Sequence, residues 1–425
     1  MVGKRSRRVK KVVASVGAAV IASAGLAACG SDSGSGTPVV NLYGFASAAG
    51  FDEVIARCNE DSGGKYKIVG NLLPSDADGQ REQLVRRLAA KDDSMDLIGL
   101  DVTWTAEFAE AKWIREIKGA QKEAALKDTL QPTIDTALWK DKLYGIPKHT
   151  NVQLLWYRKS LVPKEPKTWD DVLAASKKLK SEDKPHVIGL TAAQYEGFVV
   201  GFNTILSSVG GSLVNEDSTK VTVDDKTVKA LEILENLATG GLASKSLSNS
   251  QEPEVFASLQ NEEAAFIMNW PYVLSAMKDA DPEIAKDLGF TTLPEFVPGT
   301  PARATLGGMN WAISSYSKHP KETFDAAMCL RDPQAQLDVA LNAGEPPVNP
   351  TVYEQPEFRE AYPMYQVILE TLDTAVPRPV TPLYQNVSTI VSSTLSPPSS
   401  ISPDRTAKEL EDKIQQALDG KGILP

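Results

Sequence analysis

Tryptophan and polar side chains occur together at several points where predicted strands end. Asp101 closes a buried-type strand and is followed by Trp104. Asn151 shortly precedes Trp156, and Trp270 follows an apolar strand and opens a proline-containing turn. A sugar ring offers an apolar C–H face that an aromatic ring can cover, and a fringe of hydroxyl groups that carboxylates and amides can bind. The pattern therefore predicts non-covalent binding of a carbohydrate.

Each of these residues also has a structural explanation, which the sequence leaves open. Asp101 could instead cap the helix that is predicted to begin near Trp104. Trp156 and Tyr157 lie in an apolar run, where core packing is the more frequent role. Trp270 could be a packing residue beside a hinge.

Two further features belong to the same set. Arg378 lies between two prolines, which stiffen the backbone and hold the stem of the guanidinium group. The alternative is an exposed loop charge. Gly307 and Gly308 precede Asn310 and could serve only to let two backbone segments approach.

The motifs of common enzyme classes are missing from the sequence. It contains no Gly-x-Ser-x-Gly, no His-Glu-x-x-His and no Gly-x-x-x-x-Gly-Lys-Ser/Thr. The histidines, at positions 149, 186 and 319, show no metal-ligand spacing with the cysteines. We therefore expect no enzyme activity, no metal and no cofactor. A pair of carboxylates of the glycoside hydrolase kind stays open, because acidic residues are plentiful.

The N-terminus has the order of a lipoprotein secretion signal. Six basic residues lie between positions 4 and 11, the segment 12–28 has no charge, and Leu26-Ala27-Ala28 precedes Cys29. This order predicts a signal peptide at 1–28, lipidation of Cys29, a flexible Gly/Ser tether at 29–37 and location on the outer face of the cell membrane. An ordinary signal peptide or a single spanning helix is the alternative.

Charge and cysteine content point to an extracellular protein. The net charge is −10, and loss of residues 1–28 with their six basic residues would make it −16. Such a chain is a poor partner for nucleic acid or anionic lipid, so we expect membrane contact only through the lipid anchor. In an oxidising exterior the remaining pair, Cys58 and Cys329, favours one disulfide over two buried thiols.

The order of predicted elements indicates a two-domain α/β protein. Strands and helices alternate from residue 39 to 101, which is typical of parallel α/β architecture, and a second α/β set follows. Thr168 is the expected cap of a helix that continues to Leu179. The expected strands span 39–43, 66–73, 95–100, 186–190, 264–268 and 311–314; the other expected helices span 51–59, 79–90, 195–209, 228–237, 252–259 and 320–331.

Several segments resemble a known family. The similar stretches span 100–111, 150–158, 269–273, 307–310, 329–332 and 378–385. They resemble the extracellular sugar-binding proteins of ABC importers, the group that includes maltose-binding protein. The first, second and last stretches are similar to the trehalose-binding lipoproteins of mycobacteria and related actinobacteria.

This resemblance implies a fold of the periplasmic-binding-protein type, with two α/β lobes, crossing hinge strands and an interlobe cleft. The first lobe would comprise 38–148 and 307–348, and the second 149–306, with 349–425 mainly on the second. It implies that six residues line the cleft: Asp101, Asn151, Glu252, Trp270, Gly308 and Arg378. A Cys58–Cys329 disulfide fits the family.

The resemblance also implies a function and its partners. A monomeric binding protein would capture trehalose or a related disaccharide by hinge closure and deliver it to an ABC permease in the membrane. Two alternatives remain open at this stage: a secreted glycoside hydrolase, and a binding protein for another oligosaccharide or a glycerol phosphate ester.

Overall fold

The computed structural model describes residues 36–44 and 50–421. The predicted signal peptide at 1–28, the lipidation site Cys29 and most of the predicted tether lie outside the described residues. Within the described part of the chain, no helix is both long enough and apolar enough to cross a membrane.

The first of two main sheets has five strands in the order β2-β1-β3-β11-β6. These are β1 (Val39–Gly44), β2 (Lys67–Leu72), β3 (Leu97–Asp101), β6 (Ile146–Val152) and β11 (Leu306–Ile313). β1 pairs in parallel with β2 and β3, as the alternation of strands and helices predicts. β11, from late in the chain, runs antiparallel to both β3 and β6. The sheet is therefore mixed rather than wholly parallel.

Side chains of the first sheet alternate between two apolar cores. Val40 and Leu42 of β1 pack with α1 (Phe51–Asp61), α12 (Pro320–Cys329) and α13 (Pro333–Ala343) on one face. Ile98 and Leu100 of β3 pack with α2 (Ala77–Ala89) and α3 (Thr105–Glu110) on the other face. This period of two is expected for a strand that is buried on both faces.

The second main sheet has four strands in the order β10-β7-β9-β8. These are β7 (Leu154–Arg158), β8 (Val187–Gly189), β9 (Ala264–Asn269) and β10 (Leu288–Thr291). Trp156 and Tyr157 of β7 are buried in the core of this sheet, which confirms the core interpretation of both residues. We refer to the elements that pack on the first and second sheets as the first and second lobes.

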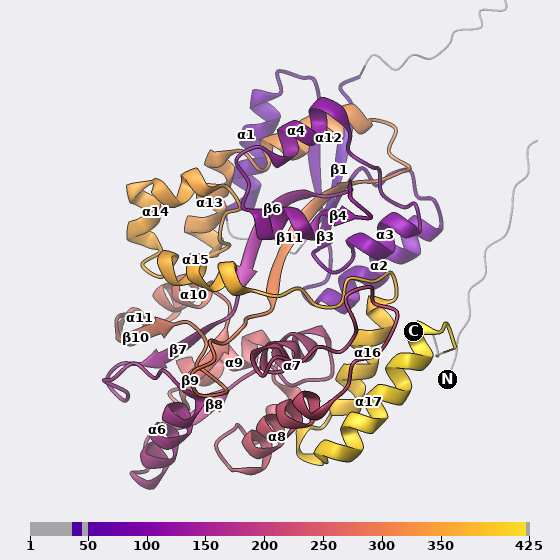
Figure 1. Cartoon of the computed structure of the whole chain (residues 1–425). Coiled ribbons are helices and arrows are strands. Elements are labelled where there is room, and N and C mark those ends of the chain that lie inside the picture. Colours follow the sequence, from indigo (N-terminus) through magenta and orange to yellow (C-terminus); the bar gives the residue numbers. More distant parts are fainter. Residues whose placement is uncertain (1–35, 45–49, 422–425) are drawn as a thin grey trace, which may run out of the picture. The chain divides into compact units, whose positions relative to one another are not determined.

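The chain passes between the two sheets more than once. β6 ends at Val152 in the first sheet, and β7 begins two residues later in the second, so that only Gln153 separates them (Figure 1). The chain returns between Thr291, the end of β10, and Leu306, the start of β11. These passages of the chain between the two sheets correspond to the crossing hinge segments that the resemblance implies. The exact domain boundaries stay a prediction.

The remaining helices surround the sheets. Late helices α16 and α17 lie beside α7 and α8 of the second lobe (Figure 1). The other elements are α4 (Gly119–Leu126), α5 (Gln131–Thr136), β4 (Leu138–Trp139), β5 (Lys142–Leu143), α6 (Trp169–Ser181), α7 (Glu196–Ser208), α8 (Asp225–Thr239), η1 (Leu247–Asn249), α9 (Glu252–Gln260), α10 (Val273–Ala280), α11 (Pro282–Asp287), η2 (Pro350–Glu354), α14 (Pro356–Ala361), α15 (Tyr365–Thr374), α16 (Tyr384–Leu395), η3 (Pro398–Ser400) and α17 (Pro403–Leu418).

Local signals in the sequence explain several of these boundaries. Thr168 caps α6 as predicted, since its hydroxyl accepts from the Asp171 amide while the Asp171 carboxylate accepts from the Thr168 amide. The predicted start of the late strand at Trp311 is wrong. β11 begins at Leu306, because Gly307 and Gly308 pair with β6 instead of forming a turn before the strand.

One disulfide joins distant parts of the chain within the first lobe. Cys58 of α1 and Cys329 of α12 are bonded and lie 271 residues apart in the sequence. This confirms the predicted pairing, and the alternative of two separate thiols is wrong. The bond links an early helix to a late one across the same core.

Candidate ligand-binding site

Asp101 lies at the end of β3 with its carboxylate fixed by the following turn. Its Oδ1 accepts hydrogen bonds from the backbone amide of Thr103 at 2.9 Å and from the Thr103 hydroxyl at 2.7 Å. The next helix, α3, has Trp104 in the N-cap position and no side-chain cap. The interpretation of Asp101 as a helix cap is therefore wrong, because its hydrogen bonds close a turn before the helix.

Arg378 is buried and faces Asp101. Its side chain is only 4% exposed, so the alternative of an exposed loop charge is wrong. The Nη2 atom lies 3.5 Å from Oδ1 of Asp101. Two residues earlier, Val376 exchanges backbone hydrogen bonds with Ala304 and Leu306, which fixes this loop against the segment that leads into β11. The guanidinium group of a late loop thus reaches the end of an early strand.

Glu196, the first residue of α7, pairs with Arg378 from the other side. Its Oε1 accepts from Nη1 of Arg378 and from the Tyr384 hydroxyl, the latter at 2.5 Å, and its Oε2 accepts from the Ser388 hydroxyl. Glu196 is 6% exposed. A buried carboxylate of this kind requires several donors to offset the loss of water, and it has three.

Tyr195, which precedes Glu196, connects α7 to a second carboxylate. The Tyr195 hydroxyl donates to Oε2 of Glu252 at 2.5 Å, and the Trp270 indole N–H donates to Oε1 of Glu252 at 3.4 Å. Burial and the Glu252 charge raise the pKa of Tyr195 above its ordinary value, so this hydroxyl stays protonated and donates. Glu252, Tyr195 and Trp270 therefore form one hydrogen-bonded group in the second lobe.

Two glycines of β11 leave room for the Trp270 ring and for the neighbouring strand β6. A Cβ atom on Gly307 would lie 3.0 Å from the Trp270 ring and 3.4 Å from the Cβ of Asn151, which pairs with Gly307 across β6 and β11. Gly308 has a φ of +118°, and a Cβ atom there would lie 2.4 Å from the carbonyl oxygen of His149. Close approach of backbone segments, the structural explanation for these glycines, is therefore confirmed.

All six residues predicted for the site join one ring of contacts. Arg378 contacts Asp101, whose strand pairs with β11 at Met309. Gly307 of β11 lies next to Asn151 and the Trp270 ring. The Trp270 indole donates to Glu252, which also accepts from Tyr195. Glu196 follows Tyr195 and closes the ring at Arg378. Side-chain contacts, strand pairing and chain neighbours thus link residues of both lobes between positions 101 and 378, while their lining of a cleft and their contact with a sugar stay a prediction.

Two polar atoms of this ring are buried without a hydrogen-bond partner among residues 36–44 and 50–421, which the structure describes. They are Oδ1 of Asn151, an acceptor, and Nε of Arg378, a donor. A buried donor or acceptor that makes no hydrogen bond costs about 1–3 kcal/mol. A ligand with hydroxyl groups supplies both a donor and an acceptor, and would remove that cost at each atom.

The charges of the ring are unbalanced toward the negative. Among its described residues the ring contains three carboxylates, those of Asp101, Glu196 and Glu252, and one cation, Arg378, which pairs with the first two. Burial would lower the pKa of Arg378, but Asp101, Tyr384 and Glu196 raise it above its ordinary value, so the guanidinium remains charged. Burial raises the pKa of Glu196, and Arg378 opposes that rise. The excess of negative charge would repel a phosphate group, so the arrangement suits an uncharged ligand.

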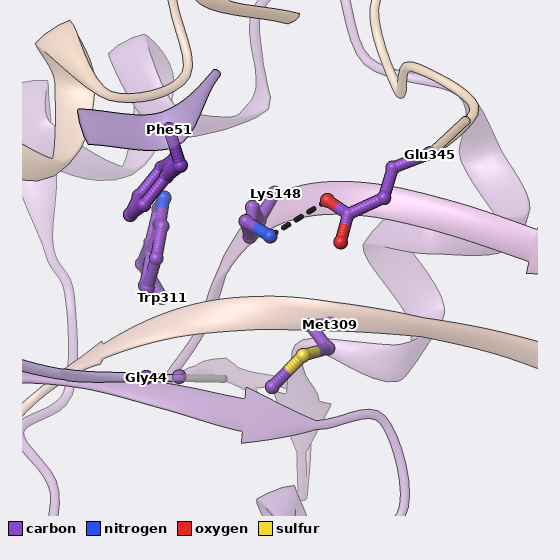
Figure 2. A pocket seen from close by; sticks show the side chains of 7 residues that line it. Gly44, Phe51, Lys148, Met309, Trp311 and Glu345 are labelled. Carbon is purple, nitrogen blue, oxygen red and sulfur yellow. Dashed lines mark hydrogen bonds and ion pairs between the residues drawn. The ribbon is translucent and has the colours of Figure 1, made fainter. Parts of the chain in front are cut away.

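A small pocket of about 20 Å³ lies on the same first sheet, beside the predicted site. Phe51 and Trp311 stack with ring centroids 5.9 Å apart, and Nζ of Lys148 lies 5.4 Å from the Trp311 centroid and 2.8 Å from a Glu345 carboxylate oxygen. Figure 2 shows Lys148 between the two rings and Glu345. Lys148 is already paired, and the volume holds about one water molecule, so this pocket is too small for a sugar ring.

Tyr195 and Glu196 are not among the site residues predicted from the sequence. A signal was present, because a tyrosine and a glutamate open a helix that is otherwise almost wholly apolar between Phe198 and Leu206. A charged residue in such a position requires a buried partner. The partner, Arg378, is 182 residues away, and no local pattern identifies it.

Comparisons with known proteins agree with this arrangement. Residues 45–337 match the family model of the bacterial extracellular solute-binding proteins. The chain is 28% identical over 348 residues to a probable ABC transporter-binding protein of Deinococcus radiodurans, covering 78% of this chain and 81% of that one. It is 24% identical to the diacetylchitobiose binding protein DasA of Streptomyces coelicolor, covering 73% of this chain and 75% of that one.

A solved structure gives the same result for the fold. The maltose-bound MalE3 of T. maritima superimposes with a TM-score of 0.81 at 26% identity, over 89% of this chain and 99% of that one. The fold is therefore the two-lobed α/β fold of the maltose-binding-protein type, as predicted. These relatives are named as binding proteins and not as hydrolases, so the glycoside hydrolase alternative is wrong, and the chain belongs to the bacterial extracellular solute-binding proteins that serve ABC sugar importers.

Proposed function

We propose that this protein captures a neutral disaccharide, trehalose in particular, and delivers it to an ABC permease. The observation that carries the proposal is the pair of unpartnered buried atoms, Oδ1 of Asn151 and Nε of Arg378, within one ring of contacts from both lobes. A hydroxylated ligand satisfies an acceptor and a donor together, and Trp270 supplies an aromatic surface for a sugar face.

The choice of a neutral sugar follows from the charges of the ring. Three carboxylates and one guanidinium group disfavour a phosphate, so the glycerol phosphate ester alternative is the weaker one. The choice of trehalose follows from the likeness of stretches 100–111, 150–158 and 378–385 to trehalose-binding lipoproteins. The similarity to a maltose-bound structure favours another disaccharide as the second candidate.

Binding would act through the crossing strands. A ligand that contacts both lobes binds their closed arrangement more tightly than an open one, and so increases its population. The closed form would then dock on the permease as a monomer. Cys29 would carry lipid and hold the protein on the outer face of the membrane. The Gly/Ser composition of the segment after it is typical of a linker between an anchor and a domain.

A thermal-shift panel tests the choice of ligand. The purified chain lacking residues 1–28 is heated with trehalose, maltose, diacetylchitobiose or glycerol 3-phosphate, since a ligand that binds only the folded state raises the melting temperature. We expect the largest rise with trehalose and none with the phosphate. A larger rise with maltose would replace trehalose by another disaccharide, and a rise with the phosphate alone would contradict the neutral-sugar proposal.

Lipid attachment is tested separately in the full-length chain. Expressed in an actinobacterial host, the protein should enter the detergent phase of a phase-separation assay, and Cys29→Ser should leave it in the aqueous phase. Equal partition of the two forms would contradict the lipid anchor.

A further inference from the structure

Glu196 is enclosed by donors of the protein and exposes little surface to a solute. Oε1 is occupied by Arg378 and Tyr384, Oε2 is occupied by Ser388, and the residue is 6% exposed. A carboxylate that is enclosed in this way contributes by holding its neighbours in place. Its position is itself fixed, because every one of the 13 residues of α7 is buried.

Arg378 depends on another residue for its orientation. It lies in the loop between α15 and α16, where its flanking prolines restrict the backbone but leave the side chain free to rotate. Four freely rotating side-chain bonds would still let the guanidinium group adopt many rotamers. Glu196 binds Nη1 and Asp101 lies beside Nη2, while Nε has no hydrogen-bond partner among the described residues.

We propose that Glu196 is a positioning residue that orients the Arg378 guanidinium group for ligand binding. Resting on the proposed sugar-binding function, this inference adds a residue that touches the binding arginine and not the solute. Charge-assisted hydrogen bonds are short and directional, so one such bond selects a single orientation of the planar group. Tyr384 and Ser388, which lie one turn apart on α16, hold the carboxylate that holds the arginine.

The test is a double-mutant cycle with Glu196→Gln, Arg378→Ala and the combined variant. Trehalose affinity is measured by calorimetry, with maltose in parallel. We expect Glu196→Gln alone to weaken binding about tenfold, because the neutral amide holds the guanidinium group less firmly. In the Arg378→Ala background the same change should alter affinity less than about twofold, because the residue through which Glu196 acts is gone.

Ser388→Ala is the milder second variant, and it leaves both the charge of Glu196 and its contact with Arg378 in place. We expect it to weaken binding about twofold to fivefold, and to have no effect once Arg378 is replaced. Melting temperatures of all variants are measured without sugar, so that a loss of folding is detected independently of affinity.

The outcomes separate this inference from the proposed function. If Glu196→Gln weakens binding by the same factor with and without Arg378, or if neither Glu196→Gln nor Ser388→Ala changes affinity, the positioning role is wrong while sugar binding stands. If the unmodified chain binds neither sugar, the proposed function fails and this inference fails with it. A cycle in which the effect of Glu196 disappears without Arg378 supports both.

Discussion

Asp78 of the first lobe accepts a hydrogen bond from the backbone amide of Glu196, the first residue of α7 in the second lobe, at 3.3 Å. The other carboxylate oxygen of Asp78 accepts from the side-chain amide of Gln385 on α16 at 3.0 Å. The N-cap residue of α7 provides no side-chain cap of its own. A carboxylate from one lobe thus caps a helix of the other, where the helix dipole favours negative charge.

We predict that Asp78→Ala destabilises the closed arrangement of the lobes. Both hydrogen bonds of Asp78 would be lost, and a cap of this kind contributes about 1 kcal/mol, so sugar affinity should fall about fivefold. Calorimetry measures the affinity, and small-angle scattering with and without sugar measures closure. Glu82→Gln is the matched control on the same helix, since Glu82 is exposed and should leave affinity unchanged. Equal affinities for Asp78→Ala and the unmodified chain would remove Asp78 from closure.

Asp101→Ala and Arg378→Ala should each weaken sugar binding by about 2 kcal/mol or more. Each change removes a polar partner and leaves buried groups of the ring or the ligand without a hydrogen bond. Calorimetric titration of each variant checks this, and Arg86→Ala, a change to an exposed arginine of α2, provides the control. Unchanged affinity in both variants would exclude these residues from the site.

The disulfide gives a prediction on stability alone. Replacing Cys58 and Cys329 together by serine should lower the free energy of unfolding by about 2–5 kcal/mol, because the bond closes a long loop in the unfolded chain. Urea unfolding with and without reductant measures the loss. Reductant should destabilise the unmodified chain and leave the double variant unaffected. Sugar affinity should stay constant, since the bond lies in the first-lobe core and not in the ring of contacts.

His149 should make the protein less stable in mild acid. Its ring is buried beside Lys148 at 3.1 Å and Glu345 at 3.0 Å, with Asp101 also near. Burial lowers the pKa of His149 below its ordinary value of 6.5, and Lys148 lowers it further. The folded chain therefore binds this proton less readily than the unfolded chain. The stabilisation from neutral His149 is complete above pH 6.5 and declines as the pH falls below it.

The measurement is urea unfolding between pH 7.5 and 5.5 for the unmodified chain and for His149→Gln. One titrating group changes stability by at most about 1.4 kcal/mol per pH unit, and that part of the slope should vanish in His149→Gln. His186→Gln, a change at a distant histidine, should keep the full slope. The same pH slope in His149→Gln and the unmodified chain would show that His149 does not titrate in this way.

The first lobe and much of the second could be predicted because their signals are local. The apolar run before Asp101 gave β3, and Thr168 with Asp171 gave the start of α6. The close approach predicted for Gly307 and Gly308 is confirmed, but β11 was predicted to begin too late, at Trp311, because glycines are infrequent inside strands. Composition alone does not show whether a pair of glycines lies before a strand or within it.

The binding site was also predictable only in part. The six predicted residues came from polar and aromatic side chains at strand ends and from resemblance, and the structure links them through one ring of contacts, while their role in binding stays a prediction. The partners of Glu196 and Asp78 could not be identified, since they lie more than 100 residues away. Which charged residue on a helix faces a distant arginine is decided by tertiary packing.

Isothermal titration of the purified chain with trehalose, followed by analysis of the recovered sugar, tests the central claim most directly. The account predicts saturable binding of one sugar per chain, binding that is tighter than for maltose, and recovery of the trehalose uncut. Absence of binding to every neutral sugar in the panel, or release of glucose from the bound trehalose, would contradict it.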